Sequence, residues 1–290
     1  MSIQQRPNLA LEKIRAGQTV HLYVMGNFAS ARHVDFVCQS GAFDALWFDL
    51  EHFDIPTAEL STLNLVAKSW PVTTFARVYV GDYQTAARIL ETGVGGLMCP
   101  MVETADQARA IVGWTKFNNP TPKQNETVGL RGWNGGGIDA RYGAFPALDY
   151  IAHQNTQTAI LAQIETPLAA ENAAEIVNVP GIDALFFGPG DFAHRLGVPG
   201  QITHPKVVAA MEHVAAAAAA AGKWWGTVAP TRETYLKVRE LGARLISPGG
   251  DVKVMTHGLR VLTETITGKP SAAPTPPSAS GAPGVSGNVY

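Results

Sequence analysis

Cysteine is scarce in this 290-residue sequence, which contains only Cys38 and Cys99. The two do not form a CxxC pair, and such distant cysteines cannot build the disulfide framework of a small secreted domain. Long apolar runs are also missing, since none approaches the roughly 20 residues that a membrane-spanning helix needs. The opening segment MSIQQRPNLALEKIRAG lacks the apolar centre of a secretion signal. These absences predict a cytoplasmic protein with no part in a membrane.

Charge is limited too. Charged residues make up 16% of the sequence, and 22 basic residues nearly balance 24 acidic ones without forming a block of either sign. Nucleic acids and anionic membranes both require a basic face on the protein, so we expect neither as a partner. Hydrophobic residues make up 46% of the chain, which is enough for a sizeable core.

Eight short apolar runs alternate with segments of helical periodicity. This alternation is typical of a parallel sheet whose strands are joined by helices, and eight such units in about 250 residues are typical of a closed (β/α)8 TIM barrel. The alternative is an open doubly wound sheet, but the turn after the first run, VMGNFAS, lacks the GxGxxG pattern of the dinucleotide-binding version. The expected strands are 21–26, 45–50, 73–78, 95–100, 159–165, 183–189, 223–228 and 243–250.

Two segments do not fit this repeat. The interval 101–158 is too long for one helix and must contain a long loop, for which 130–143 (LRGWNGGGIDARYG) is the candidate. The last stretch is rich in Pro, Ser, Ala and Gly and almost uncharged, so it cannot offset the entropy lost on ordering. We therefore expect a barrel domain over residues 1–268 and a disordered tail over 269–290.

Ionisable residues recur at the carboxyl ends of the expected strands, where TIM-barrel enzymes carry their catalytic groups. Each one alone has an ordinary explanation: Asp191 could cap the next helix, His52 could be structural, and Arg77 could pack its stem against the core. Their convergence on one rim indicates an active site. The residues are Asp49, Glu51 and His52 after the second strand, Arg77 at the third, Gln163 and Glu165 at the fifth, and Asp191 after the sixth.

Glu165 and Asp191 come from adjacent strands, and two such carboxylates can hold one hard divalent cation with room for water and substrate. Oxygen ligands suit Mg²⁺ or Mn²⁺ better than Zn²⁺. The cation and Arg77 could hold a 2-oxo acid and stabilise the enolate that forms when a carbon–carbon bond α to the carbonyl breaks. His52 could then move the proton. No lysine stands at the carboxyl end of a strand, so a Schiff base is not favoured.

Five segments of the sequence read FDLEHFD, FARV, AQIETPLAAENAAEI, GIDALFFGPGDFAHRLGVPG and HPKV. They resemble the HpcH/HpaI class II aldolases, which include the 4-hydroxy-2-oxoheptanedioate (2,4-dihydroxyhept-2-ene-1,7-dioate) aldolases. The resemblance extends from residue 8 to about residue 265. It implies a TIM barrel of the phosphoenolpyruvate/pyruvate type, a C-terminal helix exchanged between subunits, and a homo-oligomer that is a hexamer built as a trimer of dimers.

The resemblance also implies roles for the residues at the rim. A divalent metal ion, Mg²⁺ or Mn²⁺ and also Co²⁺, would be held by Glu165 and Asp191. His52 would be the acid/base, with Asp49 supporting it. Arg77 would bind the oxygens of the pyruvyl group, and pyruvate and an aldehyde would be the substrates.

Further positions follow from the same resemblance. Gln163 would line the substrate site, and the amides around Gly190 and Asp191 would bind the substrate carboxylate, with Pro189 beside them in the substrate site. In the family an acidic residue on the helix after the third strand reaches the histidine across a subunit interface. Glu91 in the segment ILETG occupies that position.

Two segments depart from the family pattern. The common motif reads closer to DGEHAP, whereas this chain has Leu50 in place of the glycine and continues with Phe53 and Asp54. The segment that begins with Arg131 and Gly132 continues with three consecutive glycines. Both segments should shape the half of the site that binds the aldehyde, so the identity of the aldehyde transfers least from the family.

The sequence therefore predicts a carbon–carbon lyase that reversibly cleaves a 4-hydroxy-2-oxo acid to pyruvate and an aldehyde through a metal-stabilised pyruvate enolate. Two alternatives stay open. The same site could serve oxaloacetate decarboxylation or citrate-lyase-like cleavage of an acyl-CoA. The chain could instead be a non-catalytic barrel that binds an organic acid, although such a barrel does not need the whole set Asp49, His52, Arg77, Glu165 and Asp191.

Overall fold

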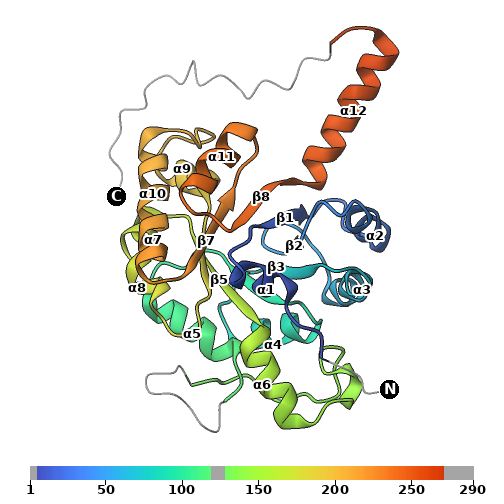
Figure 1. The fold of residues 1–290 in the computed structure, drawn as a ribbon, viewed down its shortest axis with the longest axis vertical. Helices are drawn as coiled ribbons and strands as arrows, with labels where there is room; N and C mark the ends of the chain where they lie inside the picture. Colours follow the sequence, from blue (N-terminus) through green and yellow to red (C-terminus); the bar gives the residue numbers. More distant parts are fainter. Residues whose placement is uncertain (1–4, 119–127, 271–290) are drawn as a thin grey trace, which may run out of the picture. The chain divides into compact units, whose positions relative to one another are not determined.

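Eight parallel strands close into a barrel in chain order, with β1 paired to both β2 and β8 (Figure 1). The structure, a computed structural model, describes residues 5–118 and 128–270. It confirms the predicted TIM barrel, and every strand overlaps the apolar run predicted for it. The strands are β1 (Val20–Met25), β2 (Ala45–Asp49), β3 (Thr73–Arg77), β4 (Gly96–Cys99), β5 (Ala159–Ile164), β6 (Ala184–Phe187), β7 (Trp224–Val228) and β8 (Leu245–Gly250).

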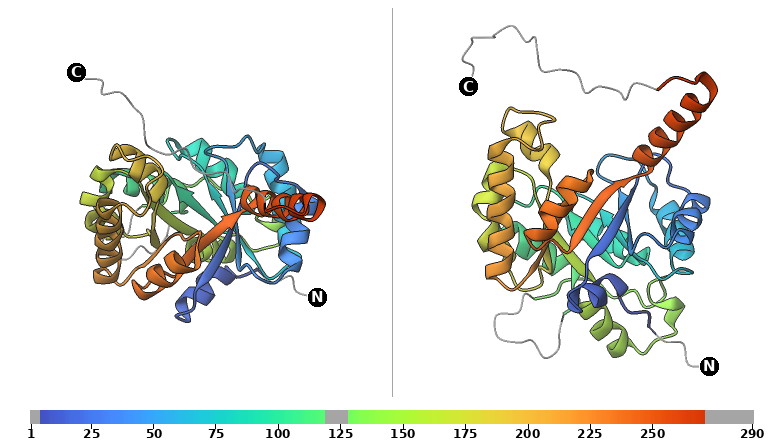
Figure 2. Two further views of the ribbon diagram at one scale, coloured as in Figure 1. Left: turned by 90° about the horizontal axis from the view of Figure 1, so that it is seen from above. Right: turned by 45° about the horizontal axis from the view of Figure 1, so that its top comes forward.

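Helices surround the strands and join each one to the next (Figure 2). Side-chain caps fix several of their starts; α5, for example, begins with a reciprocal capping box between Thr104 and Gln107. No helix in the described ranges is long and apolar enough to cross a membrane. The helices are α1 (Leu9–Arg15), α2 (Ala31–Gln39), α3 (Thr57–Ala67), α4 (Tyr83–Glu91), α5 (Ala105–Thr115), α6 (Ala147–Gln157), α7 (Pro167–Glu171), α8 (Ala173–Val177), α9 (Pro189–Arg195), α10 (Pro205–Ala220) and α11 (Arg232–Glu240).

The strands are buried on both faces, and this explains why they read as continuous apolar runs. One core fills the barrel itself, where the Trp47 and Phe186 rings meet edge to face with centroids 5.4 Å apart. Leu11 and Ile14 of α1 join this inner core. A second core lies between the strands and the surrounding helices. With its interior filled by side chains, the barrel leaves its chemistry to the residues at the strand ends.

The predicted long loop is anchored by a buried ion pair. The Arg131 Nη2 group lies 2.9 Å from Asp139 Oδ2, and the Tyr150 hydroxyl donates a hydrogen bond to the same carboxylate. The Arg131 guanidinium also lies 4.5 Å from the centre of the Phe117 ring. Beyond this anchor the loop forms a short 3₁₀ helix, η1 (Arg141–Gly143), before α6 begins. The loop therefore has a defined path over the residues that the structure describes.

The chain divides into two compact units, Met1–Val252 and Lys253–Tyr290. The first contains the barrel. The last helix, α12 (Asp251–Thr267), starts at the end of the first unit and supplies the described part of the second. The domain boundary at residue 268 stays a prediction, and residues 271–290 of the predicted tail lie outside the described residues.

Candidate active site

The last residues of β2 and β3 bring a carboxylate and a guanidinium together at the carboxyl end of the barrel. Asp49 and Arg77 are register partners on the two strands. Arg77 donates hydrogen bonds from Nε to Asp49 Oδ1 over 2.9 Å and from Nη2 to Oδ2 over 2.6 Å. The two side chains are only 3% and 9% exposed. A buried, two-pronged pair of this kind fixes the guanidinium in one orientation.

Glu51 is a third member of this cluster. Its position at the rim is predicted from the sequence, but no role is predicted for it. Its Oε2 lies 3.2 Å from Arg77 Nη1, and its backbone N–H donates to Asp49 Oδ1 over 3.1 Å. The Arg77 guanidinium also lies 4.8 Å from the centre of the Trp47 ring. Residues two apart at a strand end point to the same face, so the spacing of Asp49 and Glu51 is the signal that could have revealed it.

His52 lies next to Glu51, with half of its side chain exposed. Its Nε2 is 3.8 Å from Glu51 Oε2. The predicted partner Asp49 instead has its carboxylate bound to Arg77, so Asp49 can act on the imidazole only through Arg77 and Glu51. A half-exposed imidazole beside a carboxylate is well placed to exchange a proton with a bound substrate.

Glu165 directly follows β5 and is only 1% exposed. The Met101 N–H donates to its Oε1 over 2.8 Å, and Gln163 donates from Nε2 to its Oε2. Met101 has a left-handed backbone, with φ of 57°, which costs a residue other than glycine some free energy. That strained residue supplies a backbone donor to Glu165, a contact that no sequence motif predicts.

The electrostatics around Glu165 are dominated by burial and by other acids. Burial raises the pKa of Glu165 from 4.5 to about 7, and the charges of Glu51 and Asp191 act in the same direction, whereas the Met101 hydrogen bond and Arg77 oppose them. Burial likewise raises the pKa of Glu51, against the opposing charge of Arg77. This end of the barrel therefore has more acidic groups than one guanidinium balances, and a bound cation would be favoured there.

Asp191 lies in the first turn of α9, which begins with Pro189 and Gly190. The N-cap of that helix is Gly188, so Asp191 is not the capping residue. A Cβ on Gly188 would lie 2.9 Å from Glu165 Oε2 and would need that side chain to move. Because residue 188 is a glycine, the chain can pass this close to Glu165 and bring Asp191 into its neighbourhood.

The donor set at this end fits a hard divalent cation. Glu165 and Asp191 supply carboxylate oxygens, and one further buried acceptor, Gln163 Oε1, receives no hydrogen bond from any described residue. Within residues 5–118 and 128–270, no three His, Cys, Asp or Glu side chains are grouped as a metal site. The chain would therefore offer two carboxylates and leave the other positions to substrate and water, an arrangement that Mg²⁺ accepts.

The raised pKa of Glu165 predicts how the stability of the metal-free protein changes with pH. This carboxyl group titrates near 4.5 when unfolded and at about 7 when folded, so the folded state binds its proton more tightly. Its contribution to the free energy of unfolding is fully present below the unfolded pKa and is lost as the pH rises through the folded pKa, a loss of about 3 kcal/mol.

Urea unfolding in EDTA, compared between the wild type and Glu165→Gln, measures this loss. Between pH 4.5 and about pH 8 the wild type should lose about 3 kcal/mol relative to the variant, because only the wild type has a carboxyl group to ionise at this position. Parallel curves for the two proteins would contradict the assigned burial effect.

Glu91 lies at the other end of the barrel within its own chain. It is the last residue of α4, the helix that leads from the end of β3 back to the start of β4. Its charge acts on Tyr150, whose pKa is raised mainly by burial, whereas His52 stands at the end of β2. A pairing of Glu91 with His52 would therefore need a second copy of the chain, and it stays a prediction.

A model of the HpcH/HpaI aldolase/citrate lyase family matches residues 21–258. This range contains the whole cluster described above. The chain belongs to that family. The hydroxypyruvate/pyruvate aldolase of Cupriavidus necator is 33% identical over 241 residues, which cover 82% of this chain and 85% of that protein. The 4-hydroxy-2-oxovalerate aldolase of Novosphingobium aromaticivorans is 33% identical over 237 residues, which cover 81% and 86%.

Solved structures of the HpcH/HpaI family agree with this assignment. The crystal structure of a family member from Burkholderia cenocepacia is 28% identical to this chain, with a TM-score of 0.82 over 90% of this chain and 99% of that one. A family member from Desulfitobacterium hafniense is also 28% identical, with the same TM-score. Family and relatives together identify the chain as a carbon–carbon lyase.

Proposed function

We propose that this HpcH/HpaI family member is a metal-dependent aldolase that reversibly cleaves a 4-hydroxy-2-oxo acid to pyruvate and an aldehyde. The observation that carries the proposal is the buried cluster at the carboxyl end of the barrel. There Arg77 is clamped by Asp49, and Glu165 has a pKa raised to about 7 beside the charges of Glu51 and Asp191. A bound cation would balance the excess of acidic groups in this cluster, and Arg77 would balance the negative charge of the substrate.

The relatives support the 2-oxo acid half of the substrate. One is named for hydroxypyruvate and pyruvate, another for 4-hydroxy-2-oxovalerate, and a 32% identical relative from Salmonella dublin for 4-hydroxy-2-oxo-heptane-1,7-dioate. The last two substrates share a 2-oxo acid with a 4-hydroxyl group and differ in the rest of the molecule. We infer that the same half is bound by the cluster in this chain and that the aldehyde half differs.

Each residue of the cluster has a task that its geometry permits. Arg77, held rigid by Asp49, would bind the oxygens of the 2-oxo acid and stabilise negative charge that develops there. A divalent cation held by Glu165 and Asp191 would supply Lewis-acid stabilisation of the same charge. His52 would take the proton of the 4-hydroxyl group as the carbon–carbon bond breaks and return it in the reverse reaction.

The two ends of the substrate would meet different walls. Gln163 lies beside Glu165, and the N–H of Gly190, next to Pro189 in the first turn of α9, has no intrahelical partner, so these residues would contact the substrate carboxylate. On the other side the Phe53 ring covers the end of β1, where a Cβ on Gly26 would lie 2.3 Å from it. Phe53 would therefore bound the space for the aldehyde.

His52→Ala tests the proposed proton transfer. The rate of pyruvate release from a 4-hydroxy-2-oxo acid should fall by about 10²-fold or more because the general base is gone. An assay coupled to lactate dehydrogenase measures this rate. Metal binding should be unchanged, since His52 is not one of the proposed ligands. The matched control is His213→Ala, on an exposed position of α10, which should keep full turnover. Full turnover of His52→Ala would remove this residue from the mechanism.

We further infer that the enzyme is a cytoplasmic homo-oligomer, a hexamer as the family resemblance implies. The helix α12 carries exposed apolar side chains at Met255, Leu259, Leu262 and Ile266, which share one helical face. A stripe of this kind supports burial against another copy of the chain. Both cysteines are free thiols, as expected of a protein from a reducing compartment.

A further inference from the structure

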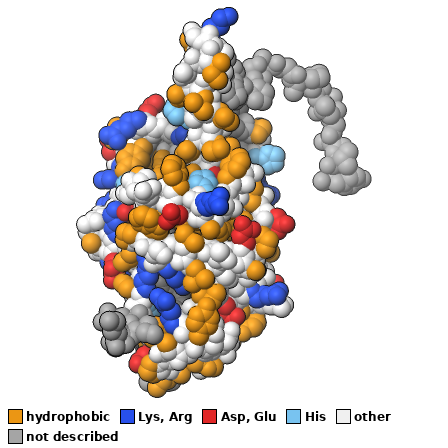
Figure 3. Space-filling view, turned by 90° about the vertical axis from the view of Figure 1, so that its right-hand side faces the viewer, with side chains coloured by type: hydrophobic (Ala, Val, Ile, Leu, Met, Phe, Trp, Pro, Cys, Tyr) orange, Lys and Arg blue, Asp and Glu red, His pale blue; other side chains and the backbone are white. Residues whose placement is uncertain are grey.

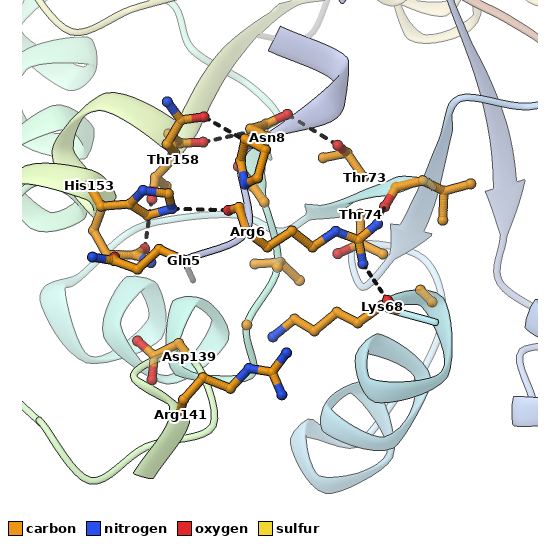
Figure 4. Close-up of a pocket in the computed structure, with 18 of the residues that line it drawn as sticks. Gln5, Arg6, Asn8, Lys68, Thr73, Thr74, Asp139, Arg141, His153 and Thr158 are labelled. Atoms are coloured by element: carbon orange, nitrogen blue, oxygen red, sulfur yellow. Dashed lines mark hydrogen bonds between the residues drawn. The ribbon is translucent and has the colours of Figure 1, made fainter. Parts of the chain in front are cut away.

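A pocket lies at the end of the barrel where the strands begin, opposite to the candidate active site (Figure 4). Thr73 at the start of β3 lines it, whereas Arg77 at the end of the same strand belongs to the candidate active site. The remaining wall comes from the segment before α1, the end of α3 and the residue after it, the turn before β4, the loop that contains η1, and α6. No residue of the candidate active site lines this pocket.

Arg6 and His153 form a fixed wall of the pocket. Arg6 donates hydrogen bonds to the backbone carbonyls of Lys68 and Val72 over 2.6 and 3.0 Å, and to that of Trp70. His153 donates from Nε2 to the Arg6 carbonyl over 3.0 Å, and burial lowers the pKa of this imidazole. Arg6 thus adds positive charge to the pocket while its own donors are already bound.

Two other cations, Lys68 and Arg141, line the pocket. Figure 4 shows the side chains of Lys68 and Arg141 reaching toward one another from opposite walls. Neither has a hydrogen bond or ion pair from its side chain among residues 5–118 and 128–270. Burial lowers the pKa of Lys68, and the charges of Arg141 and Arg6 act in the same direction, whereas the charge of Asp139 opposes them. Like charges that converge repel each other, and an anion between them would remove that repulsion.

The acid nearest to these cations does not fill this role. Asp139 lines the pocket, but its Oδ2 pairs with Arg131 over 2.9 Å and accepts the hydrogen bond of the Tyr150 hydroxyl. Its charge is therefore already matched by a buried guanidinium. The pocket keeps an excess of positive charge, and Figure 3 shows Lys and Arg side chains gathered low on one face of the molecule.

The backbone that presents Arg141 is strained. Arg141 and Tyr142 both have left-handed conformations, with φ of 51° and 57°, which side chains other than glycine adopt at a cost. Two such residues in succession persist only where the surrounding structure holds them, and strain of this kind concentrates at binding sites. The buried Arg131–Asp139 pair lies just before η1, and the Tyr142 N–H donates to the Gly137 carbonyl over 2.9 Å.

We propose that this pocket binds the phosphate or carboxylate group of a small metabolite between Lys68 and Arg141. The ammonium group supplies a point charge and the guanidinium a planar pair of donors, a combination that suits either anion. The site is separate from the candidate active site, so the proposal does not depend on the aldolase reaction. It gives the barrel a second ligand site, at the end opposite to the chemistry.

Calorimetric titration of the purified protein with inorganic phosphate, and separately with succinate, tests the proposal at constant ionic strength. We expect one saturable site per chain for at least one of the two probes. Lys68→Gln and Arg141→Gln should each weaken binding about tenfold or more. Two variants should bind as the wild type does: Lys206→Gln, a matched change on an exposed lysine of α10, and Glu165→Gln, which alters only the other end of the barrel.

Two outcomes would overturn the proposal. One is a titration in which neither probe binds saturably, or in which the wild type, Lys68→Gln and Arg141→Gln all bind with equal affinity; either result shows that these two side chains do not form an anion site. The other is a smaller assembly of both variants in sedimentation velocity at unchanged thermal stability, because the pocket would then hold an acidic group of a second copy. None of these measurements uses turnover, so their result is distinct from any failure of the proposed aldolase activity.

Discussion

Glu165→Gln should abolish both metal binding and aldolase activity. The amide has the size of the carboxylate and can still accept the Met101 hydrogen bond, and Gln163, whose Oε1 has no described partner, can turn its amide to accept from the new NH₂ group. The fold should therefore survive while the negative charge is lost. A Lewis acid supplies several kcal/mol to such a reaction, so kcat/KM should fall by about 10³-fold or more.

The measurement pairs calorimetry of Mg²⁺ or Mn²⁺ binding with the coupled assay of pyruvate release. Glu171→Gln is the matched control, since Glu171 is an exposed acid at the end of α7, and it should bind metal and turn over as the wild type does. Activity that survives in Glu165→Gln, or in the wild type stripped of metal by EDTA, would contradict the assigned metal site.

Arg77→Met should destabilise the protein by about 3–5 kcal/mol as well as inactivate it, because it leaves the carboxylate of Asp49 buried without its partner. In a barrel of this size that loss corresponds to a fall in Tm of at least about 6 °C. Thermal or urea unfolding measures the stability, and the coupled assay measures the activity. Arg109→Met is the control, since its ion pair with Asp106 is exposed and should be worth no more than about 1 kcal/mol.

The double variant Asp49→Asn, Arg77→Met separates stability from chemistry. Replacing the stranded carboxylate by an amide removes the buried charge, so a large part of the lost stability should return. Activity should not return, since the cation that faces the 2-oxo acid is still missing. If the double variant is no more stable than Arg77→Met, the ion pair is not the source of the stability. If it regains turnover, Arg77 has no part in the reaction.

The barrel and the rim were predictable because they depend on local pattern. Strands buried on both faces must be apolar throughout, so each one appears as a short run, and turns and helices must follow it. Once the strands were placed, the carboxyl ends of parallel strands had to meet at one end of the barrel. Asp49 and Arg77 therefore had to be neighbours, and the structure shows them paired.

What could not be predicted are contacts that depend on side-chain and backbone direction. Asp49 was expected to support His52, yet its bonds go to Arg77, and Glu51 is the acid beside the imidazole. The donor to Glu165 is the backbone N–H of Met101, which any residue could supply. Such contacts join segments far apart in the sequence and leave no periodic trace in it.

The same limit applies to the pocket between Lys68 and Arg141. Lys68 follows a helix and Arg141 lies in a loop that reads only as glycine-rich, so neither position carries a recognisable pattern. Their convergence depends on a turn with two successive left-handed residues. Residues other than glycine rarely adopt this conformation, so the sequence does not predict it. The pocket therefore follows from the three-dimensional path of the loop and not from the sequence pattern.

Proton NMR of pyruvate in D₂O, with the purified protein and Mg²⁺ and then with EDTA, tests whether the site forms a metal-dependent pyruvate enolate. Formation of the pyruvate enolate exchanges the methyl protons of pyruvate for deuterons from the solvent. The methyl signal should therefore disappear with Mg²⁺ and persist with EDTA. The test requires no knowledge of the aldehyde. A methyl signal that persists with every divalent metal tried would contradict the account and leave the cluster around Arg77 and Glu165 to another reaction.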